Sequence, residues 1–462
     1  MSTALPATAA LSEFVANLAV DEIPEVVRRE AKRSLIDWLG VSLMGSKDPG
    51  VGMLLAVASE MGGHGGATVI GRDEKVSTMF ATLINGYSAH VEDYDDTYNP
   101  GTTTVHGSAP VWPVVAALAE QSVTTGADAL AAFVAGFETE IRVARAAGPT
   151  HYNRGWHVTG TVGHLGAAAA AARMLRLSSA ATVSALGTAG TQAAGLKQVY
   201  GSMGKPLHPG KAAMDGLLSA LLARQGFTST PSILEGPQGF LNVLSADPNP
   251  GEITEGLGTS WMLPDNGYKF YACGSLIHPA IECVLALRSQ HGLFAADVVA
   301  IQAKVHDYVS WVTAKREPQS GLDGKFSIFH GAAVALVDGK AGLEQFTDAR
   351  VAAPEVVAVR GRVSIVTDAD MDKDAAAVTM TLSDGRRLTH TVAHNKGTPG
   401  NPLSDDEISE KFLDLVAPAL GRTSALRLLE TCWSLEDIPD FAEVIRLSSP
   451  PRHPIEHDSV TP

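Results

Sequence analysis

Hydrophobic residues recur at helical spacing through about the first 265 residues of the chain. Near the N-terminus, Leu11, Phe14 and Leu18 lie three or four positions apart, which places them on one face of a helix. Further stretches rich in Ala, Leu and Val predict helices at 26–45, 114–120, 128–143, 161–175, 180–196 and 212–225. The run at 67–71 is the exception and predicts a small strand. Because so many residues are alanine, we expect a large bundle of closely packed helices.

The pattern changes after about residue 290, where apolar and polar residues begin to alternate. The alternation over 298–305 and 357–366 predicts two half-buried strands. The runs 377–382 and 388–392, joined through Ser383-Asp384-Gly385, predict a hairpin. This part of the chain therefore mixes strands with helices.

A helix predicted at 328–337 lies between these strands, so we expect a smaller α+β domain over roughly 270–398. A stretch rich in Gly and Pro, 397–402, then breaks the regular structure. Ser404 with Glu407 three residues later is the pattern of a capping box, which predicts that the chain returns to helix there. The predicted fold is mainly α with an α+β second domain.

The charge balance narrows the classes of partner. The 462 residues include 35 Lys and Arg against 50 Asp and Glu, a formal net charge of −15. This argues against a nucleic acid, which needs a basic face, but a local pocket can still be positive. Charged residues are only 18% of the chain, below the ~25% of an average soluble domain. We therefore expect a large core, an oligomer interface, or both.

The cysteine content, the N-terminal residues and the lengths of the apolar runs predict the cellular compartment of the protein. Cys273, Cys283 and Cys432 are too few for a disulfide scaffold or a four-cysteine zinc site. The N-terminal residues lack a basic stretch followed by an apolar core, and no run of ~18 apolar residues occurs. We expect a cytoplasmic protein with no membrane partner.

The densest polar cluster is His90-Val91-Glu92-Asp93-Tyr94-Asp95-Asp96-Thr97, followed by a loop to His106. Four acids in five residues are costly unless they cap a helix, pair, bind a ligand or stay in water. An acidic helix end and a Mg²⁺ or Ca²⁺ site are both compatible with the pattern, although the spacing of an EF-hand is absent.

Two further clusters carry histidine and lysine. His157 precedes a predicted Ala-rich helix, and its imidazole is either a general acid or base or a buried structural group. Lys205 and Lys211 lie in a stretch rich in Gly and Pro that we expect to be a loop before a helix. Such a loop suits anion binding because free N–H groups lie there, and a solvated basic loop is the alternative. Pro206 stands where a phosphate-binding loop needs Ser or Thr.

The fourth cluster places Lys269 among aromatic residues, from Tyr268 to Tyr271. A lysine held between rings is partly desolvated and favours an anionic partner, unless only its stem packs on the rings. Cys273 with His278 as its base is the less favoured interpretation, because an apolar setting raises the pKa of a thiol.

In this order, the clusters resemble the MmgE/PrpD family, which includes 2-methylcitrate dehydratases, cis-aconitate decarboxylases and an iminodisuccinate epimerase. The resemblance covers about residues 10–445. The stretches that carry it are Asn85 to His90, Asp93 to Thr97, Gly155 to Thr161, Lys205 to Ala213 and Tyr268 to Cys273.

The resemblance implies a large all-helical domain built from both chain ends, with a smaller α/β lid domain inserted between them. The corresponding boundaries are 1–267 and 400–455 for the helical domain, 268–399 for the lid and 456–462 for a tail. It also implies a homodimer without a metal or an organic cofactor.

Carried over residue by residue, the resemblance implies a set of catalytic residues and a set that binds substrate. The catalytic set is Asp93, His106, His157, Lys205 and Lys269. The substrate-binding set is Thr97, Lys211, Tyr268 and His330. The sequence departs from the family in three places: the loop before His106 is about three residues longer than in the decarboxylases, His330 stands where the family has a tyrosine, and the dehydratase signature Trp-Gly-His-Pro-Ser is absent.

The residue chemistry agrees with the reaction class. Moving a proton beside a carboxylate builds negative charge, which lysines and a protonated imidazole stabilise, while a neutral histidine accepts the proton. We expect a cofactor-independent lyase acting on a small di- or tricarboxylate, 2-methylcitrate dehydratase-like or cis-aconitate decarboxylase-like. The alternatives are an epimerase of an amino-dicarboxylate such as iminodisuccinate and a non-catalytic ligand-binding helical protein.

Overall fold

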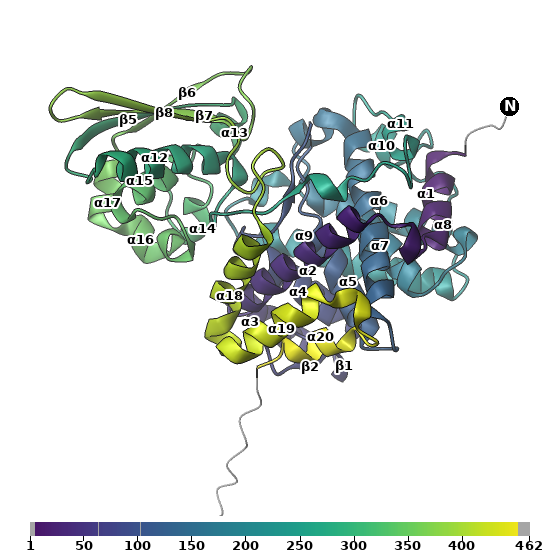
Figure 1. Ribbon diagram of the computed structural model, residues 1–462. Helices are drawn as coiled ribbons and strands as arrows, with labels where there is room; N and C mark the ends of the chain where they lie inside the picture. The colour runs from purple at the N-terminus through teal and green to yellow at the C-terminus, as the bar shows by residue number, and fades with distance from the viewer. Residues whose placement is uncertain (1–4, 63, 102, 451–462) are drawn as a thin grey trace, which may run out of the picture.

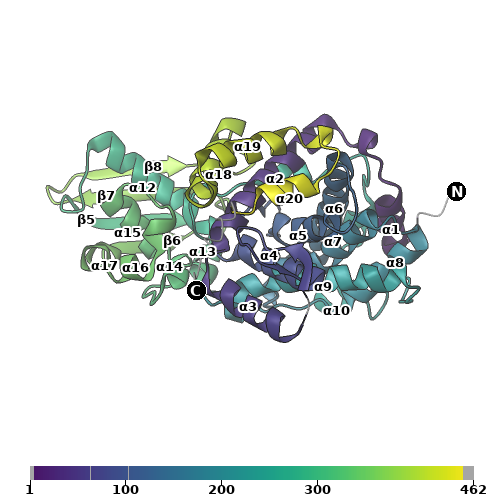
Figure 2. The same ribbon diagram turned by 90° about the horizontal axis from the view of Figure 1, so that it is seen from below.

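The computed structural model describes residues 5–62, 64–101 and 103–450 (Figure 1). A large body of helices and a smaller body with a four-stranded sheet lie side by side, and Figure 2 shows the same division from below. Each body has its own cluster of buried apolar side chains. The mainly helical fold with an α+β second domain is therefore confirmed.

The helical body is centred on α7 (Val158–Met174), which packs between α6 and α9. Its six consecutive alanines, 167–172, are all buried, and their small side chains let the neighbouring helices approach closely. The other helices before the second domain are α1 (Ala7–Asn17), α2 (Glu25–Gly45), α3 (Pro49–Glu60), α4 (Thr78–His90), α5 (Ser108–Ala119), α6 (Gly126–Asn153), α8 (Ser179–Gly190), α9 (Gly204–Arg224), α10 (Phe240–Leu244) and α11 (Gly251–Thr254).

Two short strand pairs accompany these helices. The first joins β1 (His64–Thr68) to β2 (Lys75–Val76), close to the strand predicted at 67–71. The second joins β3 (Thr97–Tyr98) to β4 (Asn266–Gly267), so it connects the end of the acidic cluster to the segment that leads into the second domain.

The second domain has a sheet in the order β6-β5-β7-β8, in which β5 is parallel to β6 and antiparallel to β7. Side chains along β7 alternate between buried and half-buried, because helices cover one face of the sheet (Figure 1). Its elements are α12 (His278–His291), β5 (Val298–Val305), α13 (Tyr308–Val312), α14 (Gly321–Gly324), α15 (Ile328–Asp338), α16 (Asp348–Ala352), α17 (Pro354–Arg360), β6 (Val363–Thr367), β7 (Ala376–Leu382) and β8 (Arg387–Val392).

The C-terminal helices return to the helical body. They are α18 (Asp405–Leu420), α19 (Arg422–Trp433) and α20 (Ala442–Leu447). The helices α18 and α19 pack against α2, and α20 packs against α19 and α5 (Figures 1 and 2). The predicted capping box of Ser404 and Glu407 begins α18. Buried Lys411 on α18 donates to Asp37 of α2 at 2.7 Å. The predicted tail, 456–462, lies outside the described residues.

Three of the predicted elements differ from the structure. Residues 357–360 belong to a helix, and only 363–367 form a strand; Pro354 at the first helical position starts this helix without losing a hydrogen bond. The helix predicted over 180–196 ends at Gly190. The expected loop around Lys205 forms the first turns of α9. Pro206 lies in the first turn, where a proline removes no intrahelical bond, and Pro209 lies further inside the helix.

In the described ranges, none of the helices combines the length and the apolar character that crossing a membrane requires.

The crossing of α4 and α9 predicts a site that is sensitive to added volume. A Cβ on Gly86 would lie 2.7 Å from the Cα of Gly210, and a Cβ on Gly210 would overlap the carbonyl oxygen of Leu83. We expect Gly210→Ala to lower the free energy of unfolding by about 1–3 kcal/mol or more, because backbone on both sides leaves no room for relaxation. Chemical denaturation measures this loss.

Gly52→Ala is the matched control, since Gly52 is exposed on α3 and an added Cβ meets nothing within 4 Å. This substitution should leave stability unchanged or raise it by up to ~1 kcal/mol, because alanine favours helix over glycine. Equal stabilities for the two variants would contradict the packing described for α4 and α9.

Candidate active site

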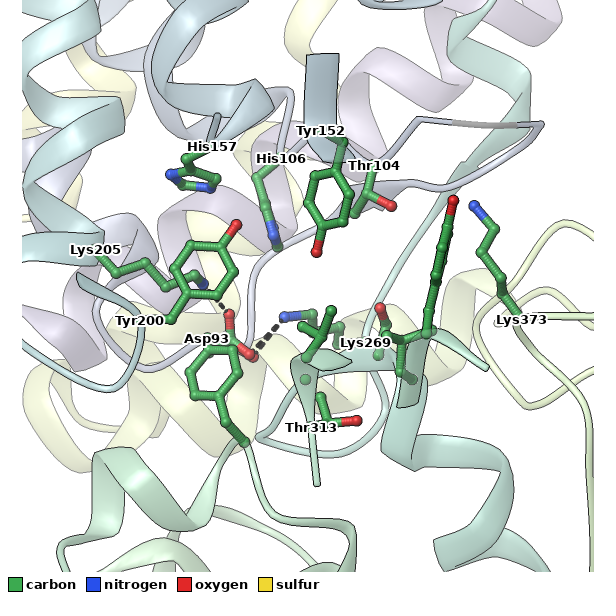
Figure 3. Close-up of a pocket in the computed structure, with 16 residues that line it drawn as sticks. Asp93, Thr104, His106, Tyr152, His157, Tyr200, Lys205, Lys269, Thr313 and Lys373 are labelled. Carbon is green, nitrogen blue, oxygen red and sulfur yellow. Dashed lines mark hydrogen bonds and ion pairs between the residues drawn. The ribbon is translucent and has the colours of Figure 1, made fainter. Parts of the chain in front are cut away.

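A pocket lies where the helical domain meets the second domain, and the five residues expected to be catalytic all line it (Figure 3). Its empty space, including solvent at the mouth, is about 680 Å³. Its lining comprises Asp93, Thr104, His106, Tyr152, His157, Tyr200, Lys205, Lys269, Gly274, Ser275, Leu276, Tyr308, Val312, Thr313, Phe326 and Lys373. Segments that are far apart in the sequence thus converge on one cavity.

Asp93 is the electrostatic centre of this pocket. One of its carboxylate oxygens pairs with Lys205, and the other lies 3.1 Å from the Nζ atom of Lys269. All three side chains are buried. Burial alone would raise the pKa of Asp93, but the two ammonium groups hold that pKa well below its ordinary value. Asp93 is therefore a permanent anion that neutralises one of the two lysines.

The backbone at Asp93 is unusual, because its φ of 51° lies in the left-handed region. This conformation costs free energy for a residue with a side chain. It follows directly after α4, and it allows the Lys269 ammonium to reach both the Asp93 carboxylate and the Asp93 carbonyl, the latter at 2.8 Å. The fold thus keeps a strained turn at a functional position.

Two further buried lysines hold the segments that carry this centre. Lys325 of the second domain donates to the carboxylate of Glu92 at 2.6 Å. Lys411 donates to the carbonyl of Tyr94 at 2.8 Å and to the carbonyl of Lys269 at 2.9 Å. The residues on both sides of Asp93 are therefore anchored to different elements.

His106 presents one definite nitrogen to the pocket. Its Nδ1 atom lies 3.0 Å from the carbonyl of Asp96 and 3.2 Å from the Asp95 carboxylate, and both are acceptors, so Nδ1 carries the proton. The Nε2 atom is then the free, basic nitrogen. Burial lowers the pKa of His106 although Asp95 raises it, so the imidazole is neutral in the empty site.

His90, the last residue of α4, belongs to the same cluster but was not among the predicted site residues. Its Nδ1 atom lies 2.8 Å from the carboxylate oxygen of Asp95 that His106 also approaches. Among the described residues, nothing hydrogen-bonds to its buried Nε2 atom. Burial lowers the pKa of His90 to about 3. The acidic cluster was visible in the sequence, but its pairing with two histidines was not.

His157 caps the start of α7 and lies above the pocket in Figure 3. Its Nδ1 atom is 2.9 Å from the Nδ1 atom of His208 on α9, so one of the two rings donates and the other accepts. Burial and the nearby Lys205 hold the pKa of His157 well below its ordinary value. His157 is thus a second neutral imidazole, coupled to a third ring outside the pocket lining.

The pocket as a whole is positive. Among the described residues that line it, Asp93 is the only carboxylate, while Lys205, Lys269 and Lys373 are cationic. Because His106 and His157 are neutral, the lysines decide the charge of the lining, while the buried carboxylate of Asp95 lies behind His106. Such a lining suits a bound anion and offers neutral imidazoles for proton transfer.

His90, Asp93 and His106 place possible metal-ligand atoms within 4.8 Å of one another. Both oxygens of Asp93, however, already face ammonium groups. A cation would have to replace two buried lysine contacts, so this donor set fits an ion pair better than a metal.

The four residues expected to bind substrate lie outside this pocket lining. Thr97 is buried behind His106, with its hydroxyl 3.3 Å from Nδ1. Tyr268 donates to the carbonyl of Glu30 at 3.3 Å. Lys211 is half-exposed and pairs with Asp215 on its own helix. His330 is buried in the second domain, where its Nε2 atom lies 2.8 Å from the Gln345 carbonyl.

Several residues line the pocket without having been predicted. They include Thr104, Tyr152, Tyr200, Ser275, Tyr308, Thr313 and Lys373, together with apolar residues of the second domain. Tyr152, Thr104 and Tyr200 lie in or next to recognised clusters, whereas nothing in the sequence pattern marks Tyr308 or Lys373. Cys273 is buried, and burial raises the pKa of its thiol, which agrees with the low expectation of a nucleophile there.

The fold and the site define a class: a two-domain, mainly helical protein with a lysine- and histidine-lined pocket between its domains. Residues 9–253 match the MmgE/PrpD N-terminal domain, and residues 271–436 match the MmgE/PrpD C-terminal domain. The chain therefore belongs to the MmgE/PrpD family, as its motifs indicated.

Several proteins of similar sequence carry the names of enzymes. A cis-aconitate decarboxylase-like protein of Aspergillus oryzae is 30% identical, covering 96% of this chain and 97% of that protein. The cis-aconitate decarboxylase of Mus musculus is 27% identical, covering 96% and 93%. A 2-methylcitrate dehydratase of Cupriavidus necator is 28% identical over 40% of each chain.

The shared carboxylate of Asp95 leads to a prediction about His106. In Asp95→Asn, the Nδ1 proton loses its charged acceptor, so we expect the pKa of His106 to fall by a further ~1–3 pH units and the Nδ1–H tautomer to lose its dominance. NMR of ¹⁵N-histidine-labelled protein measures both, with the signal assigned through His106→Gln.

Asp384→Asn serves as the control, because Asp384 is an exposed carboxylate paired with Arg386 at 2.7 Å. It should leave the His106 signals unchanged. If Asp95→Asn also left them unchanged, Asp95 would not be the group that orients this imidazole.

Proposed function

We propose that this protein is a lyase that removes CO₂ from a small unsaturated polycarboxylate, with cis-aconitate as the first candidate, without a metal or an organic cofactor. The observation that carries the proposal is the convergence of Lys205 and Lys269 with two neutral imidazoles on one pocket. Full-length similarity to proteins named cis-aconitate decarboxylase supports this reaction over dehydration.

The chemistry follows from where charge develops. When the C–C bond to the departing carboxylate breaks, its electron pair stays on the substrate and spreads through the double bond toward a neighbouring carboxylate. Lys205 and Lys269 lie where ammonium groups stabilise that negative charge. The carbanion is then quenched by one proton, which gives the product acid and CO₂.

His106 is the residue proposed to deliver that proton. It is neutral in the empty pocket because burial lowers its pKa. A bound polycarboxylate brings negative charge next to the ring, which raises the pKa and favours uptake of a proton on Nε2. The Nδ1–H bond to Asp95 and Asp96 keeps Nε2 aimed at the substrate.

Dehydration of a 2-methylcitrate-like acid remains the second candidate, because a 2-methylcitrate dehydratase is similar over part of the chain. It needs a carbanion beside a carboxylate as well, so the same charges serve it. The two reactions, and an epimerisation, differ in the product: loss of CO₂, loss of water, or an unchanged mass.

We expect the purified protein to convert cis-aconitate to an acid lighter by CO₂, and to do so equally well after dialysis against a chelator. Lys205→Met should lower kcat/KM by about 10²- to 10³-fold, as expected when a group that stabilises transition-state charge is removed. Mass spectrometry of the products and initial rates measure both.

Lys75→Met is the matched control, since Lys75 pairs with Glu120 in the same domain but is half-exposed. It should keep the wild-type rate. Turnover of neither cis-aconitate nor 2-methylcitrate, or an activity that the chelator abolishes, would contradict the proposal.

The pH dependence distinguishes an acid from a base at His106. For proton delivery by His106, kcat/KM should fall as the pH rises above the lowered pKa of the free imidazole, which lies below 6.5. The rate at saturation should hold to a higher pH, because bound polyanion raises the pKa. Rates are corrected for ionisation of the substrate.

The opposite sign would change the assignment. If kcat/KM fell as the pH dropped through this pKa, the reactive form of His106 would be the neutral base, as proton abstraction in dehydration or epimerisation requires. The homodimer that the resemblance implies and the cytoplasmic location expected from the sequence composition both stay predictions. Light scattering of the purified protein tests the dimer.

A further inference from the structure

Lys373 is the pocket residue whose charge the proposed chemistry does not use. It lies in the connection between β6 and β7 of the second domain, far in sequence from every recognised motif. In Figure 3 it stands across the pocket from Lys205 and His157. The pocket therefore has cationic groups at two separate places.

The ammonium of Lys373 has little compensation within the protein. Its Nζ atom donates to the carbonyl of Asn99 at 3.2 Å, and within the described chain no carboxylate lies within ion-pair distance of it. The adjacent Asp374 pairs with His394 instead, at 2.8 Å. Burial lowers the pKa of Lys373 to about 8, as expected for a partly desolvated cation without a bound counter-ion.

The buried lysines elsewhere near the site behave differently. Lys325 pairs with Glu92 and Lys411 pairs with Asp37, so each carries its own carboxylate. Lys205 and Lys269 share Asp93, so the lining at that end has one more ammonium than carboxylate, with the Asp95 carboxylate behind His106. Lys373 adds a second positive charge at the other end. Two separated positive charges match an anion with a carboxylate at each end.

We propose that Lys373 forms a second carboxylate subsite, which selects substrates carrying a distal carboxylate in addition to the one beside the reacting carbon. Leu276 and Val312 also line the pocket, and their apolar surface suits the hydrocarbon part of such a molecule. The assignment of the reacting end rests on the proposed function, whereas the recognition of two carboxylates does not depend on the reaction.

The hydrogen bond from Lys373 to the carbonyl of Asn99 fixes where the ammonium group lies in the pocket. Asn99 follows β3 of the helical domain, so the ammonium contacts both domains across the pocket. A carbonyl accepts one of the three ammonium protons and leaves the others for a ligand. The carbonyl thus orients the lysine without neutralising it.

Binding of glutarate and of its monoamide, glutaramate, tests the subsite without requiring turnover. The two probes have the same length, but glutaramate carries only one carboxylate. By calorimetry we expect the wild-type protein to bind glutarate at least tenfold more tightly. Lys373→Met should weaken glutarate binding by about tenfold, the loss of one charge-assisted hydrogen bond in a half-buried setting, and change glutaramate binding by less than threefold.

Two variants control for general effects. Lys373→Arg keeps the positive charge and should retain most of the preference for glutarate. Lys340→Met removes an exposed lysine of the same domain that pairs with Glu344 at 3.0 Å, and it should behave as the wild type. Melting temperatures show whether each variant folds.

Equal affinity of the wild-type protein for the two probes would overturn the subsite, and this result needs no variant. Equal weakening of both probes by Lys373→Met would overturn it as well. A preference for glutarate that Lys373→Met abolishes would support the subsite even if cis-aconitate is not turned over. In that case the proposed reaction fails while the recognition of two carboxylates stands.

Discussion

The ion pair of Asp93 with Lys205 and Lys269 is the interaction on which the site depends. Charges buried this deeply are costly unless they are paired. One carboxylate between two ammonium groups satisfies this requirement only when three distant segments meet. Because one acid cannot neutralise two lysines, the lining at this point has one more ammonium than carboxylate. The same contact therefore holds three distant segments together and gives the pocket the charge on which the proposed function depends.

The ion pair of Asp93 lies where the two domains meet. The helical domain contributes Asp93, Lys205 and the imidazoles, and the segment that enters the second domain contributes Lys269. The second domain contributes Tyr308, Phe326 and Lys373 to the opposite wall. Burial keeps His106 and His157 neutral while the pocket is empty. In the proposed function, the negative charge of a bound polycarboxylate raises the pKa of the imidazoles, so ligand binding and protonation are coupled. Membership in the MmgE/PrpD family agrees with such a site.

The local sequence pattern predicted an element correctly where the burial of one face, or a capping pair, decides the structure of that element. The alternation at 298–305 and the capping box at Ser404 both appear in the fold as expected. The same reasoning was wrong for 357–366, where a proline-started helix precedes a shorter strand, and for the segment around Lys205, where prolines lie in a helix rather than a loop. A proline near the start of a helix and a proline in a loop have the same local sequence pattern. Contacts with other parts of the chain decide which of the two structures forms.

By itself, the sequence determined the mainly helical class, the α+β insertion and the clusters that supply five residues of the pocket. Those features are local, because they depend on periodicity and on residue types within short stretches. Only the tertiary structure decided that Asp95 is shared by two histidines, that Lys373 faces the same cavity, and that Lys211 and His330 do not. Such relations depend on packing between distant segments, and the chemistry of a single stretch does not contain them.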